Sequence, residues 1–247
     1  MAGMLSAVRT ALTLLGAWQA LVWLLAPPRY ILPAPLDVAA AFVRQPGYLF
    51  ANTMVTMGEI AAGFLAGTVL GIVTALAVVA LPRIGRAVWP LVLLLQAFPV
   101  FVIAPLLVLW FGFGMASKVV MTTLIIFFPV ASAFADGLRR IEPDLLDATA
   151  LSSASPWQAL VLVRVPLAMP ALVSGLRGAA PLAPLGAVIG EWVGASAGLG
   201  FVMVQANARM QTDTVFAAMT VIAVLTLVLR RAVDALGPLL APWAPER

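Results

Sequence analysis

The stretch 65-LAGTVLGIVTALAVVAL-81 decides the fold class, because it runs without a charged residue and without alternation between apolar and polar positions. A hydrocarbon core about 30 Å thick needs about 20 helical residues to cross it, whereas a transmembrane β-barrel strand alternates. Blocks of this kind recur along the 247 residues, which are 63% hydrophobic and 10% charged, with a mean hydropathy of +1.09. The sequence therefore predicts an all-α, polytopic transmembrane helical bundle, with residues 1–247 forming one domain.

We expect about six spans along the chain. The first apolar block is longer than the core of a secretory signal and has no clear cleavage site after it, so it is interpreted as a span. An even number of spans places both termini on the same side of the membrane. The predicted spans are residues 9–26, 51–81, 87–110, 117–137, 166–190 and 213–236.

Basic residues at the ends of these spans predict the orientation, since cytoplasmic loops carry an excess of Lys and Arg. A cytoplasmic N-terminus leaves only four basic residues on the outside: Arg29, Arg44, Lys118 and Arg209. Nine arginines then lie at cytoplasmic ends, so both termini are predicted to be cytoplasmic. These arginines are Arg9, Arg83, Arg86, Arg139, Arg140, Arg164, Arg230, Arg231 and Arg247.

Composition excludes several classes of function. The chain has no cysteine and no histidine, which removes disulfides, thiolate nucleophiles, imidazole bases and nearly all zinc chemistry. Its basic residues are scattered, whereas a nucleic-acid-binding face is clustered, so no nucleic-acid partner is expected. No pair of acidic residues lies close together within a span, so we predict neither a catalytic residue nor a metal site.

The segment 112-GFGMASKVV-120 is only faintly similar to a phosphate-binding loop. Such a loop needs a glycine before its lysine and a hydroxyl residue after it, but Ser117 and Val119 flank Lys118. The segment is also predicted to face outward, away from cytoplasmic ATP. ATP hydrolysis is therefore expected only from another chain.

Small residues and prolines predict local features of three segments. Gly63, Gly67 and Gly71 form a stripe at four-residue spacing, which lets a neighbouring helix approach closely. Pro181 and Pro184 interrupt the fifth span, either as a simple kink or as a deformable helix lining a solute path. On the outer side, residues 36–43 are expected to form a short helix after an extended, proline-rich run.

The segment 139-RRIEPDLLDATALSSASPW-157 concentrates scarce acidic residues in the longest cytoplasmic loop. Pro143 suits the first turn of a helix, and Asp144 complements the helix dipole there. Serines and Pro156 end this helix, and a second begins near Trp157. The segment predicts a two-helix elbow at the membrane surface, which is either an interfacial loop or a docking site for another protein.

The spacing of 147-DATALSSASPWQALVLVRVPLAMP-170 resembles the EAA loop of ABC importer permeases, whose pattern is Glu-Ala-Ala, three residues, Gly, nine residues and Ile-x-Leu-Pro. Asp, Thr and Ser replace the Glu, the second Ala and the Gly of that pattern. The resemblance implies a coupling helix, within a loop of about residues 138–165, that docks in a groove of a cytoplasmic ATPase. The residues expected to couple are Pro143, Leu146, Asp147, Ala148, Thr149, Ser153, Ala154 and Pro166.

Three further segments, 31-ILPAPLDV-38, 98-FPVFVIAPLLVLWFGFGMASK-118 and 185-LGAVIGEWVGASAGLG-200, are similar to permeases of the nitrate, sulfonate and taurine group. Within it, 184-PLGAVIGEWVGASAGLGFVMVQANARMQTD-213 most resembles permeases for hydroxymethylpyrimidine-type thiamine precursors. The resemblance implies a type I ABC importer permease-like fold and a homodimer embedded in lipid in the bacterial inner membrane. It also implies an external substrate-binding protein and an ATPase dimer that binds ATP and Mg, with no cofactor in this chain.

Polar residues within or beside the spans predict a solute path, because a charge at mid-membrane normally faces a cavity or a partner. The predicted path residues are Glu59, Gln96, Glu191 and Trp192. A carboxylate and an indole suit a protonatable aromatic heterocycle. The alternative places both acids at the interface, paired with Arg44, Lys118 or Arg209.

Other functions stay open at this point. The solute is alternatively a sulfonate, taurine or nitrate-type anion. An ATP-independent secondary transporter often shows inverted repeats and midplane charges, and neither is evident. An intramembrane enzyme has little chemistry to work with in this composition.

Overall fold

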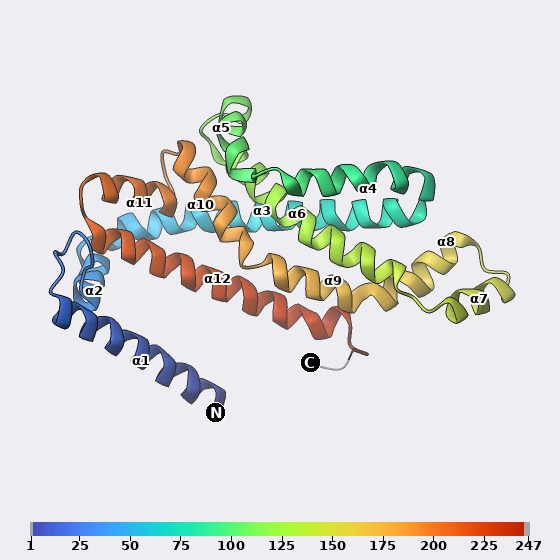
Figure 1. Cartoon of the computed structure of the whole chain (residues 1–247), viewed down its shortest axis with the longest axis horizontal. Helices are drawn as coiled ribbons and strands as arrows, with labels where there is room; N and C mark the ends of the chain where they lie inside the picture. Colours follow the sequence, from blue (N-terminus) through green and yellow to red (C-terminus); the bar gives the residue numbers. More distant parts are fainter. Residues whose placement is uncertain (1, 245–247) are drawn as a thin grey trace.

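The computed structural model describes residues 2–244, and all their side chains except those of residues 2–8, 95–97, 143, 146, 148 and 150. Every regular element in this range is helical, as predicted (Figure 1). The helices are α1 Ala2–Leu25, α2 Pro35–Arg44, α3 Pro46–Ala80, α4 Pro82–Ala97, α5 Val100–Phe111, α6 Met115–Arg139, α7 Pro143–Leu151, α8 Pro156–Ala159, a π-helical segment Leu160–Arg164, α9 Val165–Ala179, α10 Leu182–Gly194, α11 Leu199–Ala208 and α12 Thr212–Leu240.

Four helical segments are long and apolar enough to cross a membrane: Pro46–Ala80, Met115–Arg139, Pro156–Gly194 and Thr212–Leu240. They correspond to the second, fourth, fifth and sixth predicted spans. The first predicted span lies in α1, whose apolar part Arg9–Leu25 is shorter. The helical bundle expected from hydropathy is therefore confirmed for these spans.

The third predicted span, 87–110, is wrong as one continuous helix. Helix α4 ends at Ala97, and α5 begins at Val100. Between them Phe98 adopts an extended backbone conformation with ψ of 129°, because the ring of the following Pro99 disfavours the helical conformation at the residue before it. The apolar run therefore forms two short helices that take different directions (Figure 1).

Helices α3 and α6 form the centre of the bundle, and the glycine stripe lies between them. A Cβ atom added at Gly67 would stand 2.8 Å from Cβ of Ile126, and one at Gly71 would stand 3.0 Å from Cβ of Val130. Only a residue without a side chain allows two helix backbones to pack this closely. The packing role predicted for the stripe is confirmed.

Prolines define the other predicted boundaries. Helix α9 ends at Ala179, and Pro181 stands at the start of α10, so the fifth span is interrupted where the sequence indicates. The short outer helix is also present, as α2, with Pro35 in its first turn.

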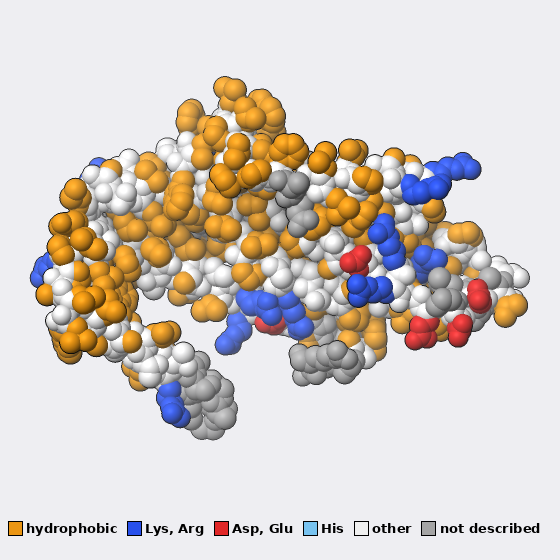
Figure 2. Space-filling model, viewed as in Figure 1, with side chains coloured by type: hydrophobic (Ala, Val, Ile, Leu, Met, Phe, Trp, Pro, Cys, Tyr) orange, Lys and Arg blue, Asp and Glu red, His pale blue; other side chains and the backbone are white. Residues whose placement is uncertain are grey.

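The two ends of the bundle differ in what they carry (Figure 1). Helices α2 and α11 lie at one end, whereas α7 and α8 project from the other, towards which α12 also runs before the C-terminus. Helix α1 diverges from the bundle and is held at its C-terminal end, where Trp18 packs on Phe216 with ring centroids 5.4 Å apart. Hydrophobic side chains cover much of the visible surface (Figure 2).

Candidate functional site

The predicted elbow is present as α7 and α8, joined by a short turn. Asp144 lies in the first turn of α7, where a carboxylate complements the helix dipole. Ser155 caps α8, since its Oγ accepts from the Gln158 N–H at 3.2 Å while Gln158 Oε1 accepts from the Ser155 N–H at 2.8 Å. This reciprocal pair is a capping box, and it fixes where the second helix begins.

The turn of the elbow depends on Ser153, the residue at the glycine position of the EAA pattern. Ser153 has φ of 58°, a left-handed conformation that favours glycine. The Ala154 N–H donates to the Thr149 carbonyl oxygen at 3.2 Å, and Ser152 Oγ donates to the same oxygen at 2.8 Å. These bonds satisfy a carbonyl at the end of α7, so serine adopts the conformation that the pattern assigns to glycine.

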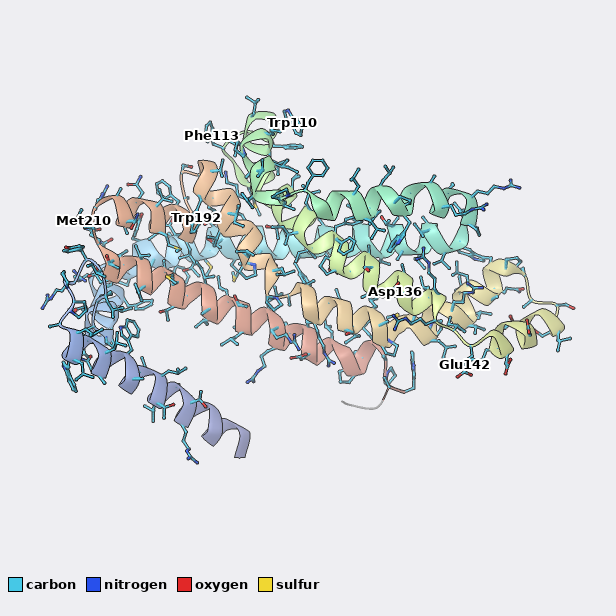
Figure 3. The ribbon with its side chains drawn as sticks, viewed as in Figure 1. Trp110, Phe113, Asp136, Glu142, Trp192 and Met210 are labelled. Atoms are coloured by element: carbon cyan, nitrogen blue, oxygen red, sulfur yellow. The ribbon has the colours of Figure 1, made fainter. Side chains whose placement is uncertain are left out.

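The elbow presents exposed carboxylates and apolar side chains together. Asp144 and Asp147 of α7 are exposed, as are Leu151 and Trp157, and Glu142, which precedes α7 and is not one of the predicted coupling residues, is exposed as well. Figure 3 places Glu142 at the elbow end, away from the bundle. Such a mixed surface is suited to a protein partner rather than to lipid alone.

The remaining coupling residues are placed less fully. Ala154 and Pro166 are half-buried, with Pro166 in the first turn of α9, and Thr149 is half-buried in α7. The side chains of Pro143, Leu146 and Ala148 lie outside the described residues. At the base of the elbow, the Arg139 guanidinium lies 4.7 Å from the ring centroid of Trp89, which is a cation–π contact.

A second candidate site is a buried cluster of charges from three spans. Glu59 of α3, Lys118 of α6 and Glu191 of α10 are each at most 2% exposed. The Glu59 and Glu191 side chains are close neighbours. Lys118 Nζ donates to the Phe113 carbonyl oxygen at 2.7 Å and also to the carbonyl oxygen of Gly194.

This cluster also fixes the first turn of α11. Glu191 accepts hydrogen bonds from the Gly200 N–H and, at 2.6 Å, from the Thr56 hydroxyl. Thr56 Oγ1 in turn accepts from the Leu199 N–H at 2.7 Å, and Asn52 Oδ1 accepts from the Gly198 N–H at 2.7 Å. Side chains of α3 and α10 thus satisfy backbone donors that a helix N-terminus leaves unpaired.

Sequence reasoning missed Asn52 and Thr56. Their spacing with Glu59, four and three residues apart, places all three on one face of a helix. A polar face within an apolar span is the signal in the sequence that identifies them.

This cluster bears on the expectations about charge. Lys118 lies in the first turn of α6, at the end of the span where it was expected, but its side chain is buried and its ammonium group donates to two carbonyl oxygens. The expectation of no close acidic pair concerned single spans, whereas Glu59 and Glu191 come together from two helices that are distant in sequence. Of the alternative that pairs both acids with Arg44, Lys118 or Arg209, the pairing with Lys118 agrees with the structure, and both acids are buried within the protein.

The four predicted path residues do not all converge. Glu59 and Glu191 are together, and Oε2 of Glu59 has no hydrogen-bond partner among the described residues. The Trp192 side chain is 53% exposed and lies outside this buried cluster (Figure 3). The side chain of Gln96 lies outside the described residues. Within the described part of the chain, no three acidic side chains come together as a metal site would need.

Comparison with known proteins decides the family. Residues 67–243 match the family model of the binding-protein-dependent transport system inner membrane component. The chain belongs to this family. The elbow lies within the matched residues and is therefore a segment of an ABC transporter permease. A permease of this family is a transport subunit.

Relatives extend the similarity over nearly the whole chain. A probable ABC transporter permease protein of Haemophilus influenzae is 46% identical, over 90% of each chain. The riboflavin transport permease RibX of Chloroflexus aurantiacus is 35% identical, over 95% of this chain and 88% of its own. The formylaminopyrimidine transport permease ThiX of Halalkalibacterium halodurans is 32% identical, over 96% of this chain and 94% of its own. A permease named for taurine transport in Escherichia coli is 30% identical, over 90% of this chain and 81% of its own. A permease named for aliphatic sulfonates in Bacillus subtilis is 29% identical, over 85% of this chain and 77% of its own. The predicted group is confirmed.

The fold has a solved counterpart. An inward-facing crystal structure of the MetNI methionine ABC transporter superposes with a TM-score of 0.69 and 19% identity, covering 80% of this chain and 98% of that chain. The type I ABC importer permease-like fold is confirmed by this match.

Proposed function

We propose that this permease works as a homodimer which receives a small solute from an external substrate-binding protein and releases it into the cytoplasm by alternating access. The elbow of α7 and α8 carries the proposal. It projects beyond the bundle at one end and presents exposed carboxylates beside exposed apolar residues (Figure 1). Closure of a cytoplasmic ATPase dimer against this elbow is the step that moves the spans.

The ATPase subunits supply the nucleotide chemistry. They bind ATP and Mg, whereas this chain contributes no cofactor site. Both termini and the elbow lie in the cytoplasm of a bacterial cell, and the spans lie in its inner membrane. Asp147 is the central coupling residue, because its carboxylate stands at the acidic position of the EAA pattern and is exposed.

Charge reversal at Asp147 tests the coupling. We expect Asp147→Lys to abolish solute-stimulated ATP hydrolysis and uptake while leaving membrane insertion and dimer formation intact, because a cation then faces a groove built for a carboxylate. The measurement is ATP hydrolysis and solute uptake by the permease reconstituted with its ATPase and binding protein.

The matched control for this test is Glu142→Lys, which makes the same charge change in the same loop but outside α7. It should keep most of the uptake rate. Uptake at the parental rate in the Asp147 variant would contradict a docking role for the elbow.

The proposed solute is a hydroxymethylpyrimidine-type thiamine precursor. The similarity to ThiX over almost the full chain supports this class. RibX is named as a riboflavin transport permease, and riboflavin is also a nitrogen heterocycle. The alternative is an anion of the sulfonate, taurine or nitrate type, supported by the taurine and sulfonate relatives.

Within the path, Glu59 is the residue proposed to meet the solute, because its Oε2 has no partner among the described residues. Glu191 is proposed to orient Glu59, while Gln96 and Trp192 stay predictions for the wall of the path. The solute is tested by growth of a thiamine-requiring strain on hydroxymethylpyrimidine. Growth that depends on this transporter supports the pyrimidine class, and growth on taurine as sulfur source instead would favour the anion class.

A further inference from the structure

The fifth span is broken between α9 and α10, and Pro181 stands at the break. A proline has no backbone N–H, so within a helix it leaves unpaired the carbonyl oxygen of the residue four positions before it. For Pro181 that residue is Arg177, in the last turn of α9. The donor just before the proline is already used, because the Ala180 N–H donates to the Leu176 carbonyl oxygen at 2.9 Å. The Arg177 carbonyl oxygen therefore needs a partner from outside the α9 backbone.

That partner is Arg230 of α12. Its Nη1 atom donates to the Arg177 carbonyl oxygen at 2.7 Å, and the arginine is half-buried. Its Nε atom lies 3.2 Å from Oδ2 of Asp234, which stands one turn further along α12. The donors of a guanidinium group point in fixed directions within one plane, so the carboxylate orients the group while the group bonds the carbonyl oxygen.

Arg177 makes the reverse contact, from α9 to α12. Its Nε atom lies 2.8 Å from Asp234 Oδ1. A Cβ atom added at Gly237 would stand 3.1 Å from Arg177 Nη2, so the glycine leaves room for the guanidinium group against the α12 backbone. Helix α12 thus holds both the backbone and the side chain of Arg177, directly before the break.

The second proline near the break, Pro184, does not depend on another helix. It would free the carbonyl oxygen of Ala180, but this oxygen accepts from the Ala183 N–H at 3.4 Å. A turn within the chain therefore meets one freed oxygen, whereas a side chain of α12 meets the other. The bond from Arg230 is specific to the oxygen that Pro181 leaves unpaired.

The direction of α10 follows from the geometry of this break. Helices α9 and α10 take different directions (Figure 1), although Ala180 and Pro181 both keep right-handed helical backbone angles, with φ of −53° and −67°. The bend therefore arises at the proline, as is usual for sharp kinks, and not from an extended residue. A contact that fixes the last turn of α9 also fixes the direction in which α10 continues.

We propose that Arg230 is a positioning residue of the permease. Its guanidinium group supplies the hydrogen bond that Pro181 denies to the Arg177 carbonyl oxygen, and it thereby fixes the direction of α10. Asp234 orients Arg230. Because α10 carries Glu191, Arg230 acts on the solute path through this helix. The effect on transport rests on the proposed function, whereas the effect on the helix break does not.

A double-mutant cycle on the purified full-length permease tests this assignment. Arg230→Met removes every donor but keeps a long side chain, and it should lower the thermal unfolding midpoint by about 2–4 °C or more. Pro181→Ala restores a backbone N–H at an exposed position, where the helical backbone angles direct it towards the Arg177 carbonyl oxygen. In the Pro181→Ala background, Arg230→Met should therefore lower the midpoint by less than half as much.

Two matched controls accompany the cycle. Arg231→Met removes the same charge from the next position of α12, which is exposed, and it should leave the midpoint unchanged. Pro184→Ala also removes a proline near the break, but the oxygen that it would free already has a partner. In that background the loss caused by Arg230→Met should stay undiminished.

Hydrogen exchange and uptake distinguish positioning from general stabilisation. In Arg230→Met the amides of residues 176–190 should exchange at least about fivefold faster, because the break opens more readily when its carbonyl oxygen is unpaired. The amides of α3 and α6 should exchange as in the parental protein. Solute uptake by the reconstituted transporter should fall, while its basal ATP hydrolysis should stay the same because the elbow is unchanged.

Four results would overturn the proposal. They are an equal midpoint loss from Arg230→Met with and without Pro181→Ala, the same loss in Arg231→Met, faster exchange throughout the bundle, and uptake at the parental rate in Arg230→Met. If Arg230→Met alone does not fold, the double variant with Pro181→Ala should fold, and its failure to fold would count against the proposal.

Failure of the proposed function gives a different pattern. In that case the parental protein itself shows no uptake of the tested solutes. The midpoint cycle and the exchange measurements still decide the role of Arg230, because they need no solute, ATPase or binding protein.

Discussion

At the scale of single residues, Thr56 connects the buried cluster to α11. Its hydroxyl is fully buried, lies 2.6 Å from Glu191 Oε1 and accepts the Leu199 N–H. Thr56→Val keeps the shape but leaves a carboxylate oxygen and a backbone donor unpaired, each worth about 1–3 kcal/mol. We expect a lower free energy of unfolding by that order, measured by SDS-induced unfolding with tryptophan fluorescence.

Thr122→Val is the control for this substitution. Thr122 is equally buried, but its Oγ1 has no hydrogen-bond partner among the described residues. Removal of an unpartnered hydroxyl should be neutral or stabilising, because no partner is left without its bond. Equal destabilisation by the two substitutions would show that the hydrogen bonds of Thr56 do not account for the loss in the free energy of unfolding.

The sequence predicts residue roles well where local geometry decides them. Ser153 is identified from its place at the glycine position of the EAA pattern that the sequence resembles, and its positive φ agrees with that position because a turn between two helices constrains its own backbone. The burial of Lys118 is not predicted, since it depends on the Gly194 carbonyl oxygen of α10, far along the chain. Glu59 and Glu191 are predicted to share one path, but the Thr56 and Asn52 side chains that join this cluster to α11 are missed, because a one-dimensional pattern does not register partners from other helices.

At the scale of elements, the α3–α6 contact depends on the missing side chains of the glycine stripe. Gly67→Ala would place Cβ 2.8 Å from Ile126 Cβ and 3.0 Å from the Thr123 carbonyl oxygen. The helices must move apart, and overpacking of this kind destabilises by about 1–3 kcal/mol. We expect a lower thermal unfolding midpoint for the purified permease.

Gly58→Ala on the same helix is the control. An added Cβ there meets only the Met115 Cε atom at 3.5 Å, the end of a flexible side chain. Alanine should stabilise this helix by about 0.5–1 kcal/mol. If Gly58→Ala and Gly67→Ala lowered the midpoint equally, helix propensity rather than close packing would explain both.

Hydropathy predicts how long an apolar helical run is, but it predicts less well whether that run forms one unbroken helix. Residues 87–110 are apolar almost throughout, yet the helix ends before Pro99. Loss of the helical conformation at Phe98 is a local backbone effect that an averaged hydropathy does not register. Pro181 has a comparable effect, and there the sequence indicates the break correctly because two prolines lie close together.

At the scale of the whole molecule, the two ends of the bundle carry different elements. The elbow end carries α7 and α8, and the opposite end carries α2, α11 and the ion pair between Arg44 and Asp213 (Figure 1). The sequence assigns four basic residues to the end opposite the elbow and nine to the elbow side, and this asymmetry predicts that the elbow faces the cytoplasm.

The absence of cysteine from the sequence allows this orientation to be tested directly. Arg29→Cys and Leu151→Cys place single thiols at opposite ends, at positions where both side chains are exposed. A membrane-impermeant maleimide should label Arg29→Cys in intact spheroplasts, whereas Leu151→Cys should react only after the membrane is permeabilised. Reaction of both thiols after permeabilisation is the control for local burial. Labelling of Leu151→Cys in intact cells would place the elbow outside, out of reach of any cytoplasmic ATPase.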